Sequence, residues 1–179
     1  MSLSFPGFFS PAAGPEAPLQ MLAACHTRVE KQCRTLERLQ AHLPTHGSDA
    51  AAQEAASAVL RYFDSAARHH HEDEEQDLFP ALLEAMAGSD AVCIRELTAT
   101  LLAEHRQLEA RWAALRSVLQ AVADGQAAVL TVAQVQDFVN AYRAHILRED
   151  TELLPMAERL LGEPALAEIG QAMRERRGL

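Results

Sequence analysis

One pattern of histidine, glutamate, leucine and proline occurs twice in this chain and constrains its fold more than any other feature. The first copy consists of His70, Glu74, Leu78 and Pro80. The second copy has the same spacing and consists of His145, Glu149, Leu153 and Pro155. Residues four positions apart lie on the same face of an α-helix, so each copy places an imidazole beside a carboxylate. Phe63 and Phe138, seven residues before each histidine, indicate that this face points inward.

Two further histidines, His26 and His105, lie on apolar stripes of two other predicted helices. Leu22 and Leu101 stand four residues before them. The shared apolar positions that follow are Val29, Cys33 and Leu36 after His26, and Leu108, Trp112 and Leu115 after His105. The chain therefore resembles two copies of one helical hairpin, each with an inward histidine followed by an inward His-x-x-x-Glu pair.

Four long helical patterns with short connections predict an all-α, antiparallel up-down-up-down four-helix bundle. The predicted helices span residues 18–43, 49–87, about 90–124 and 131–161, and a short C-terminal helix covers 164–176. Ser89 or Asp90 is expected to cap the third helix, and Thr131 with Gln134 has the signature of a capping box. Pro80 and Pro155 are expected to kink or interrupt their helices.

The organisation expected from these patterns is an irregular Pro-rich N-terminal arm at 1–18 and a bundle domain at 19–179. Phe5, Phe8 and Phe9 of the arm are expected to pack on the bundle, with a contact to a protein partner as the alternative. The formal net charge of −9 argues against nucleic acid as a partner. No apolar run is long enough to span a membrane. Three cysteines without CxxC spacing argue against a disulfide scaffold, and the absence of an export signal predicts a cytoplasmic location.

Several imidazoles and carboxylates directed into one core lose their contacts with water, and this loss must be compensated by other partners. A carboxylate buried alone is unfavourable, and a buried histidine needs a partner. A pair of metal ions satisfies all of them, because imidazole suits iron, zinc or copper and a carboxylate can bridge two ions. The six candidate ligands are His26, His70, Glu74, His105, His145 and Glu149.

With these residues the chain resembles the hemerythrin family over residues 20–160, in particular the bacterial hemerythrin-like (HHE cation-binding) branch with four histidines and two glutamates. The resemblance implies a di-iron centre on the six candidates. Glu74 and Glu149 would bridge the irons together with an oxo or hydroxo group, and zinc is a substitute metal. Oxygen-carrying hemerythrins use a fifth histidine. Here Leu101 and Glu109 stand four residues before and after His105, so the fifth histidine is expected to be missing.

The resemblance implies a metal centre that meets oxygen, nitric oxide or peroxide, in sensing, iron handling or stress protection. Both a binding protein and an enzyme fit this chemistry. The alternative is a metal-free or zinc-binding bundle that acts as an interaction module. A ferritin-like oxidase is disfavoured, because such enzymes use Glu-x-x-His pairs and no glutamate here has a histidine three residues later.

His69 and His71 flank the candidate ligand His70 by about 100° on either side, so they are expected at the rim or surface. A register shift by one residue would instead pair His71 with Glu75. The alignment of Pro80 with Pro155 favours His70 as the ligand.

Asp77 and Glu152 occupy equivalent places in the two copies and are candidates for orienting a ligand imidazole. A surface position is the alternative for both. Tyr142 is expected to pack in the core rather than to bond a metal-bound species. Cys33 is expected to act as a small buried apolar residue, and a redox role for Cys25 or Cys33 has no support in the sequence.

Overall fold

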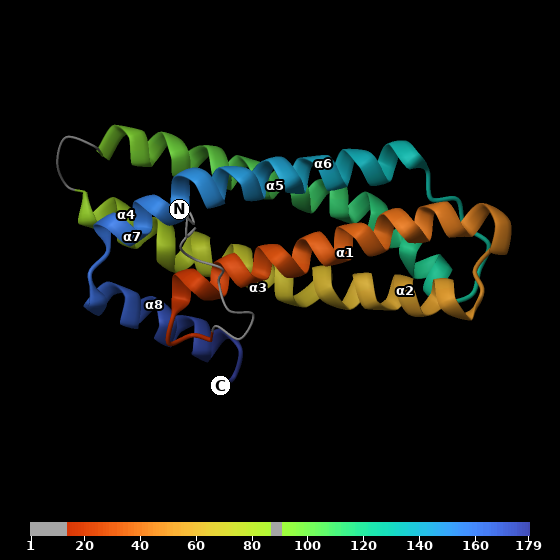
Figure 1. Ribbon diagram of the computed structural model, residues 1–179, viewed down its shortest axis with the longest axis horizontal. Helices are drawn as coiled ribbons and strands as arrows, with labels where there is room; N and C mark the ends of the chain where they lie inside the picture. Colours follow the sequence, from red (N-terminus) through yellow and green to blue (C-terminus); the bar gives the residue numbers. More distant parts are fainter. Residues whose placement is uncertain (1–13, 87–90) are drawn as a thin grey trace, which may run out of the picture.

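The computed structural model describes residues 14–86 and 91–179, which form four antiparallel helical rods and one short helix (Figure 1). The first rod is α1 (Pro18–His46). The second is formed by α2 (Ala50–Arg61), α3 (Ala67–Asp73) and α4 (Phe79–Ala85), joined by the π-helical turns η1 (Tyr62–Ala66) and η2 (Glu74–Leu78). The third is α5 (Ala91–Ala123). The fourth is formed by α6 (Val132–Arg148), η3 (Glu149–Leu153) and α7 (Leu154–Leu160), and α8 (Glu163–Arg176) follows.

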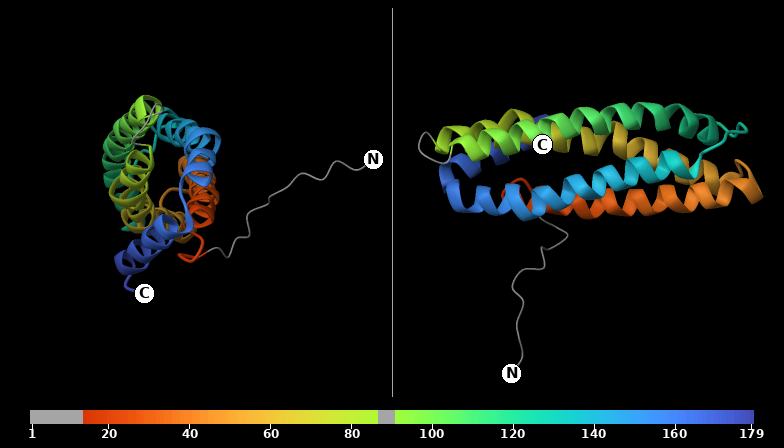
Figure 2. Two further views of the ribbon diagram at one scale, coloured as in Figure 1. Left: turned by 90° about the vertical axis from the view of Figure 1, so that its left-hand side faces the viewer. Right: turned by 90° about the horizontal axis from the view of Figure 1, so that it is seen from above.

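Successive rods run in opposite directions, and the end-on view in Figure 2 shows the rods arranged around one common axis. The predicted all-α, up-down-up-down bundle is therefore confirmed. The helix α8 packs against the first part of α1 and against α3. Gly170 permits this packing, because a Cβ atom there would collide with the carbonyl oxygen of Pro15. Predictions for the arm before residue 14 and for the cap at Ser89 or Asp90 lie outside the described residues.

The helix ends follow local side-chain chemistry. Thr131 and Gln134 form the predicted capping box, in which Thr131 Oγ1 accepts from the Gln134 N–H at 3.2 Å. Asp49 caps α2 by accepting from the Ala52 N–H at 2.9 Å. The predicted end of the first helix at residue 43 was wrong by three residues. A proline in the last turn removes only one hydrogen bond, and the helix ends at Gly47, whose φ is +62°.

The interruptions predicted from the two prolines take the form of π-helical turns. In η2 the Phe79 N–H donates to the Glu74 carbonyl, and in η3 the Leu154 N–H donates to the Glu149 carbonyl. Each turn ends two residues before a proline, which has no N–H for the carbonyl four residues earlier. Both glutamates of the repeated pattern therefore begin a π-turn.

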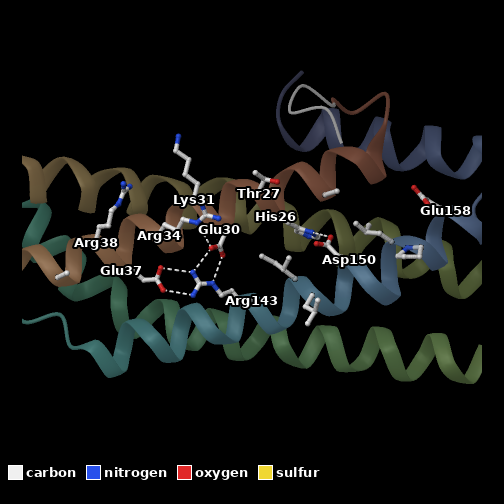
Figure 3. Close-up of a pocket in the computed structure, with 16 residues that line it drawn as sticks. His26, Thr27, Glu30, Lys31, Arg34, Glu37, Arg38, Arg143, Asp150 and Glu158 are labelled. Carbon is white, nitrogen blue, oxygen red and sulfur yellow. Dashed lines mark hydrogen bonds and ion pairs between the residues drawn. The ribbon is translucent and has the colours of Figure 1, made fainter. Parts of the chain in front are cut away.

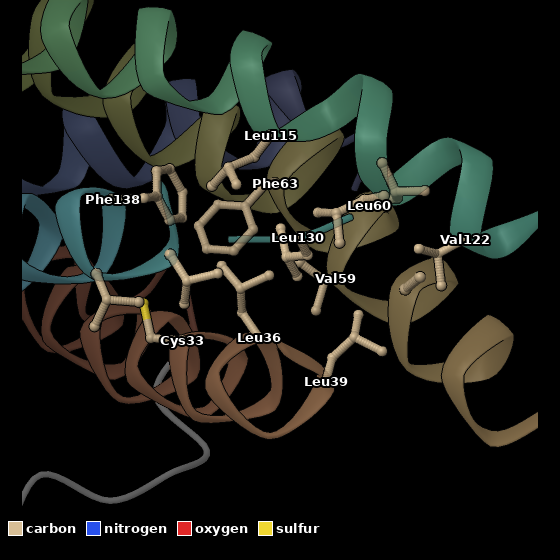
Figure 4. Packing of buried hydrophobic residues seen from close by; sticks show 14 of the residues in the cluster. Cys33, Leu36, Leu39, Val59, Leu60, Phe63, Leu115, Val122, Leu130 and Phe138 are labelled. Atoms are coloured by element: carbon tan, nitrogen blue, oxygen red, sulfur yellow. The ribbon is translucent and has the colours of Figure 1, made fainter. Parts of the chain in front are cut away.

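The apolar core consists of two clusters. One fills the α2 end of the bundle, where Phe63 and Phe138 meet Leu36, Val59 and Leu115 (Figure 4). The other lies at the opposite end and includes Leu22, Leu78, Leu101, Leu153 and Met173. Within residues 14–86 and 91–179, every helix is too short or too polar to cross a membrane.

Candidate metal centre

The six predicted ligands come together between the two apolar clusters. Each is at most 4% exposed, and Glu74, His105 and Glu149 are 0% exposed. They project from all four rods: His26 from α1, His70 and Glu74 from α3 and η2, His105 from α5, and His145 and Glu149 from α6 and η3. The structure therefore brings together every side chain that the repeated pattern singled out.

The donor atoms form two groups that share both glutamates. One group contains His26 and His70, the other contains His105 and His145, and the donor atoms within each group lie within 4.8 Å of one another. The oxygens of Glu149 point to different groups: Oε2 is 2.9 Å from Nε2 of His26, and Oε1 is 2.8 Å from Nε2 of His145.

Glu74 repeats this arrangement with the remaining histidines. Its Oε1 is 3.6 Å from Nε2 of His70, and its Oε2 is 3.2 Å from Nε2 of His105. Each glutamate therefore presents one oxygen to each histidine pair. This is the arrangement in which two carboxylates bridge a pair of cations.

The inward atoms of the centre fit metal ions, because they are buried and lack hydrogen-bond partners. Among the described residues, this holds for Nε2 of His26, His105 and His145 and for all four carboxylate oxygens of Glu74 and Glu149. Polar atoms buried in this way are uncommon in folded proteins. Imidazole nitrogens and carboxylate oxygens together form a donor set that suits iron or zinc.

The outward nitrogens of three histidines are bonded to carboxylates on neighbouring helices. Nδ1 of His26 lies 2.7 Å from Asp150, Nδ1 of His105 lies 2.8 Å from Glu75, and Nδ1 of His145 lies 2.9 Å from Glu104. An imidazole that donates Nδ1–H to such a carboxylate keeps Nε2 as the nitrogen that can bind a metal ion. The three outer carboxylates, Glu75, Glu104 and Asp150, thus orient the histidines for metal binding.

Of the two interpretations given for Asp77 and Glu152, the orienting role was wrong for both, and the surface position was correct for Glu152. Asp77 bonds Arg176 of α8 at 2.7 Å, and the Glu152 side chain is exposed. A position three residues after the glutamate points away from the centre, whereas Glu75 and Asp150, one residue after it, lie beside a histidine of the adjacent rod. Glu75 and Asp150 occupy equivalent positions in the two copies of the repeated pattern, and this equivalence could have identified them from the sequence.

In the metal-free centre, protons on His26 and His105 offset the negative charge of the buried Glu149 carboxylate. Burial by itself lowers the pKa of His26, but the nearby carboxylates of Asp150 and Glu149 outweigh burial and raise the pKa to about 9. His105 behaves in the same way, and Glu149 and Glu74 raise its pKa to about 10. Burial alone would raise the pKa of Glu149, but His145 and its neighbours hold that pKa well below its usual value. A bound cation takes the place of these protons.

His71 is the main correction to the predicted site. It is only 6% exposed, not at the rim or surface, and its ring stacks on His105 with centroids 3.9 Å apart. Burial, followed by the charges of His105 and His70, places its pKa well below the usual value. The alternative pair of His71 with Glu75 does not form, because Glu75 bonds His105. His70 faces the other ligands, as predicted from the alignment of the two copies. The buried face of α3 is wider than one stripe of side chains and includes His71 as well.

The remaining predicted residues lie close to the centre. Tyr142 is buried against Phe63 and Phe138, as the packing interpretation expected, and burial raises its pKa well above the usual value. Cys33 is buried, and burial raises its pKa to about 12. Burial also opposes ionisation of Cys25, but His70 and Arg28 outweigh it and lower its pKa.

Two openings in the surface approach the centre. A groove along α1 and α6 reaches His26 and Asp150, and its floor carries Arg143, which bonds Glu30 and Glu37 (Figure 3). On another side, a cavity of about 400 Å³ ends at His71. Its inner wall is formed by Phe63, Ala67, His71, Leu108, Trp112 and Tyr142.

Comparisons with known proteins agree with this geometry. The sequence model of the Hemerythrin HHE cation binding domain matches residues 17–157, a range that includes all six predicted ligands. An uncharacterized protein of Haemophilus influenzae is 34% identical over 160 residues, which cover 89% of this chain and 90% of that protein.

Proposed function

Since the chain belongs to the hemerythrin HHE cation-binding family, we propose that it binds two iron ions between its four helical rods. One ion lies between His26 and His70, and the other between His105 and His145. Glu74 and Glu149 bridge the two ions. The centre meets oxygen, nitric oxide or peroxide, in sensing, iron handling or stress protection.

The observation that supports this proposal most strongly is the set of inward atoms without partners. Two separate histidine pairs face the two oxygens of each shared glutamate. Among the described residues, the four carboxylate oxygens and Nε2 of His26, His105 and His145 have no hydrogen-bond partner. One cation would leave one histidine pair unused. Two cations use both pairs and both oxygens of each glutamate.

The other parts of the site prepare it for metal. Glu75, Glu104 and Asp150 fix three imidazoles with Nε2 inward, which raises their basicity as ligands. The two apolar clusters lie on either side of the site. When bound, a pair of iron ions supplies reversible one-electron chemistry and an open coordination position for a small molecule.

Iron stoichiometry combined with an optical spectrum tests the proposal. Wild-type protein loaded with ferrous salt and oxidised is expected to contain two irons per chain and to absorb visible light. His70→Ala and Glu149→Ala each remove a ligand, and the bridging carboxylate serves both ions, so both variants should lose the pair. Glu152→Ala is the matched control, because Glu152 lies one turn beyond Glu149 with an exposed side chain.

The outcomes separate the proposal from its alternatives. Folded wild-type protein without metal would contradict it and favour the interaction module. Two zinc ions without visible absorption, at the same six ligands, would favour the zinc alternative. Addition of nitric oxide, oxygen or hydrogen peroxide to the reduced iron protein should change its spectrum. An unchanged spectrum with all three would contradict the small-molecule part of the proposal.

A further inference from the structure

One buried imidazole beside the centre is not used by the six-ligand arrangement. The side chain of His71 is directed from α3 to the histidine pair of His105 and His145, and one ring nitrogen from each of the three lies within 4.8 Å of the others. Nε2 of His71 is buried and has no hydrogen-bond partner among the described residues. A buried polar atom without a partner needs an explanation.

The two histidines beside His71 use their Nδ1 atoms for bonds outside the centre. Nδ1 of His105 is bonded to Glu75 and Nδ1 of His145 to Glu104, and Nε2 of each ring is buried without a hydrogen-bond partner among the described residues. Three imidazole nitrogens that lie this close together form a set that one cation would coordinate.

We propose that His71 is a third imidazole ligand of the ion held by His105 and His145. This inference rests on the proposed function, and it makes the two ions different. His71, His105 and His145 would supply three imidazoles to one ion, whereas His26 and His70 would supply two to the other.

The first test compares His71→Ala with wild type in iron binding, measured under anaerobic conditions against a competing chelator. Loss of a direct ligand should weaken one of the two binding steps by about tenfold or more, because even partners of ligands contribute that much. In Mössbauer spectra of protein loaded with ⁵⁷Fe, the doublet of one ion should change more than the other. His69→Ala is the matched control, since His69 precedes His70 and is only half-buried.

The second test uses the cavity that ends at His71. In His71→Ala the removed ring leaves space that joins this cavity, so added imidazole should enter and restore the weakened step. His71→Leu fills the same space without a nitrogen, and imidazole should not restore binding there. Circular dichroism of the metal-free variants checks that both are folded.

The results distinguish this inference from the proposed function. If wild type binds two irons and His71→Ala binds both with unchanged affinity and an unchanged Mössbauer spectrum, the inference is overturned and the di-iron proposal stands. If His71→Leu matches wild type while His71→Ala is weakened, His71 only fills space and the inference is again overturned. If wild type binds no iron, the proposed function fails and the inference fails with it.

Discussion

At the scale of single residues, the centre depends on carboxylates that never face it. Glu104 of α5 lies outside the ligand set, yet it bonds Nδ1 of His145 at 2.9 Å. The variant Glu104→Gln keeps the shape of the side chain and removes its charge. We expect metal affinity to fall by about tenfold, because the imidazole becomes a weaker and less well-oriented ligand. A chelator competition measures this change.

Glu96→Gln is the control for that variant. Glu96 lies on the same helix, two turns earlier, with an exposed side chain. Its substitution should leave metal affinity unchanged. Equal affinities for Glu104→Gln and wild type would show that the contact between Glu104 and His145 does not tune the site.

Tyr142 provides a second prediction at this scale. Its ring packs on Phe63 and Phe138, with centroids 5.4 and 5.1 Å away. If packing is its role, Tyr142→Phe keeps the ring and should bind two irons with the wild-type affinity and spectrum. Tyr142→Leu, which removes the aromatic contacts, should lower stability by about 1 kcal/mol in urea titrations. A changed iron spectrum in Tyr142→Phe would instead assign a role to the hydroxyl.

The sequence predicted which six side chains converge but not which residues support them. Helical spacing gives the side of a helix on which His70 and Glu74 lie, so their meeting could be anticipated. The bond between His26 and Asp150 depends on how two rods are rotated against each other, and spacing within one helix carries no such information. The surface position predicted for His71 assumed that only one narrow stripe of this helix faces inward. In the structure the buried face of α3 is wider and includes both His70 and His71.

At the scale of elements, the prolines predicted where the regular α-helices are interrupted but not what form the interruptions take. Pro80 and Pro155 indicated interruptions, and both helices respond with a π-turn that begins at a glutamate of the centre. A proline removes a hydrogen bond, but whether the helix kinks, ends or widens depends on the packing around it. Here the widened turns keep each rod continuous through the site.

The capping box at the start of α6 gives a prediction for one element. Thr131→Ala removes the hydroxyl that accepts from the Gln134 N–H, and α6 carries His145 and leads into Glu149. We expect a loss of about 1 kcal/mol in the free energy of unfolding. Thr100→Ala, in the middle of α5, is the control, and it should not destabilise because alanine favours the helix interior. Chemical denaturation of both variants makes the comparison, and equal stabilities would contradict the role of the cap.

At the scale of the whole molecule, the alternation of long helical patterns and short connections was sufficient to predict the bundle. The position of α8 was not predictable, because it depends on contacts between residues far apart in the sequence. Arg176 of α8 and Arg177, which follows the helix, both bond Asp73 of α3, whose side chain is 1% exposed. Asp73 stands directly before Glu74, so α8 covers the outer side of a segment that carries the centre.

The contact between α8 and Asp73 gives a prediction about global stability. Replacing both arginines, as Arg176→Ala with Arg177→Ala, leaves the Asp73 carboxylate buried without its cations. A buried charge without its partner typically destabilises a protein by about 3 kcal/mol or more, so the urea midpoint of the metal-free protein should fall clearly. Arg174→Ala is the control, because Arg174 bonds only Gln171 of its own helix among the described contacts. Asp73→Asn should then recover much of the loss in the double variant, because it removes the uncompensated charge. If the double variant unfolds at the wild-type midpoint, α8 does not support the metal-binding part of the bundle.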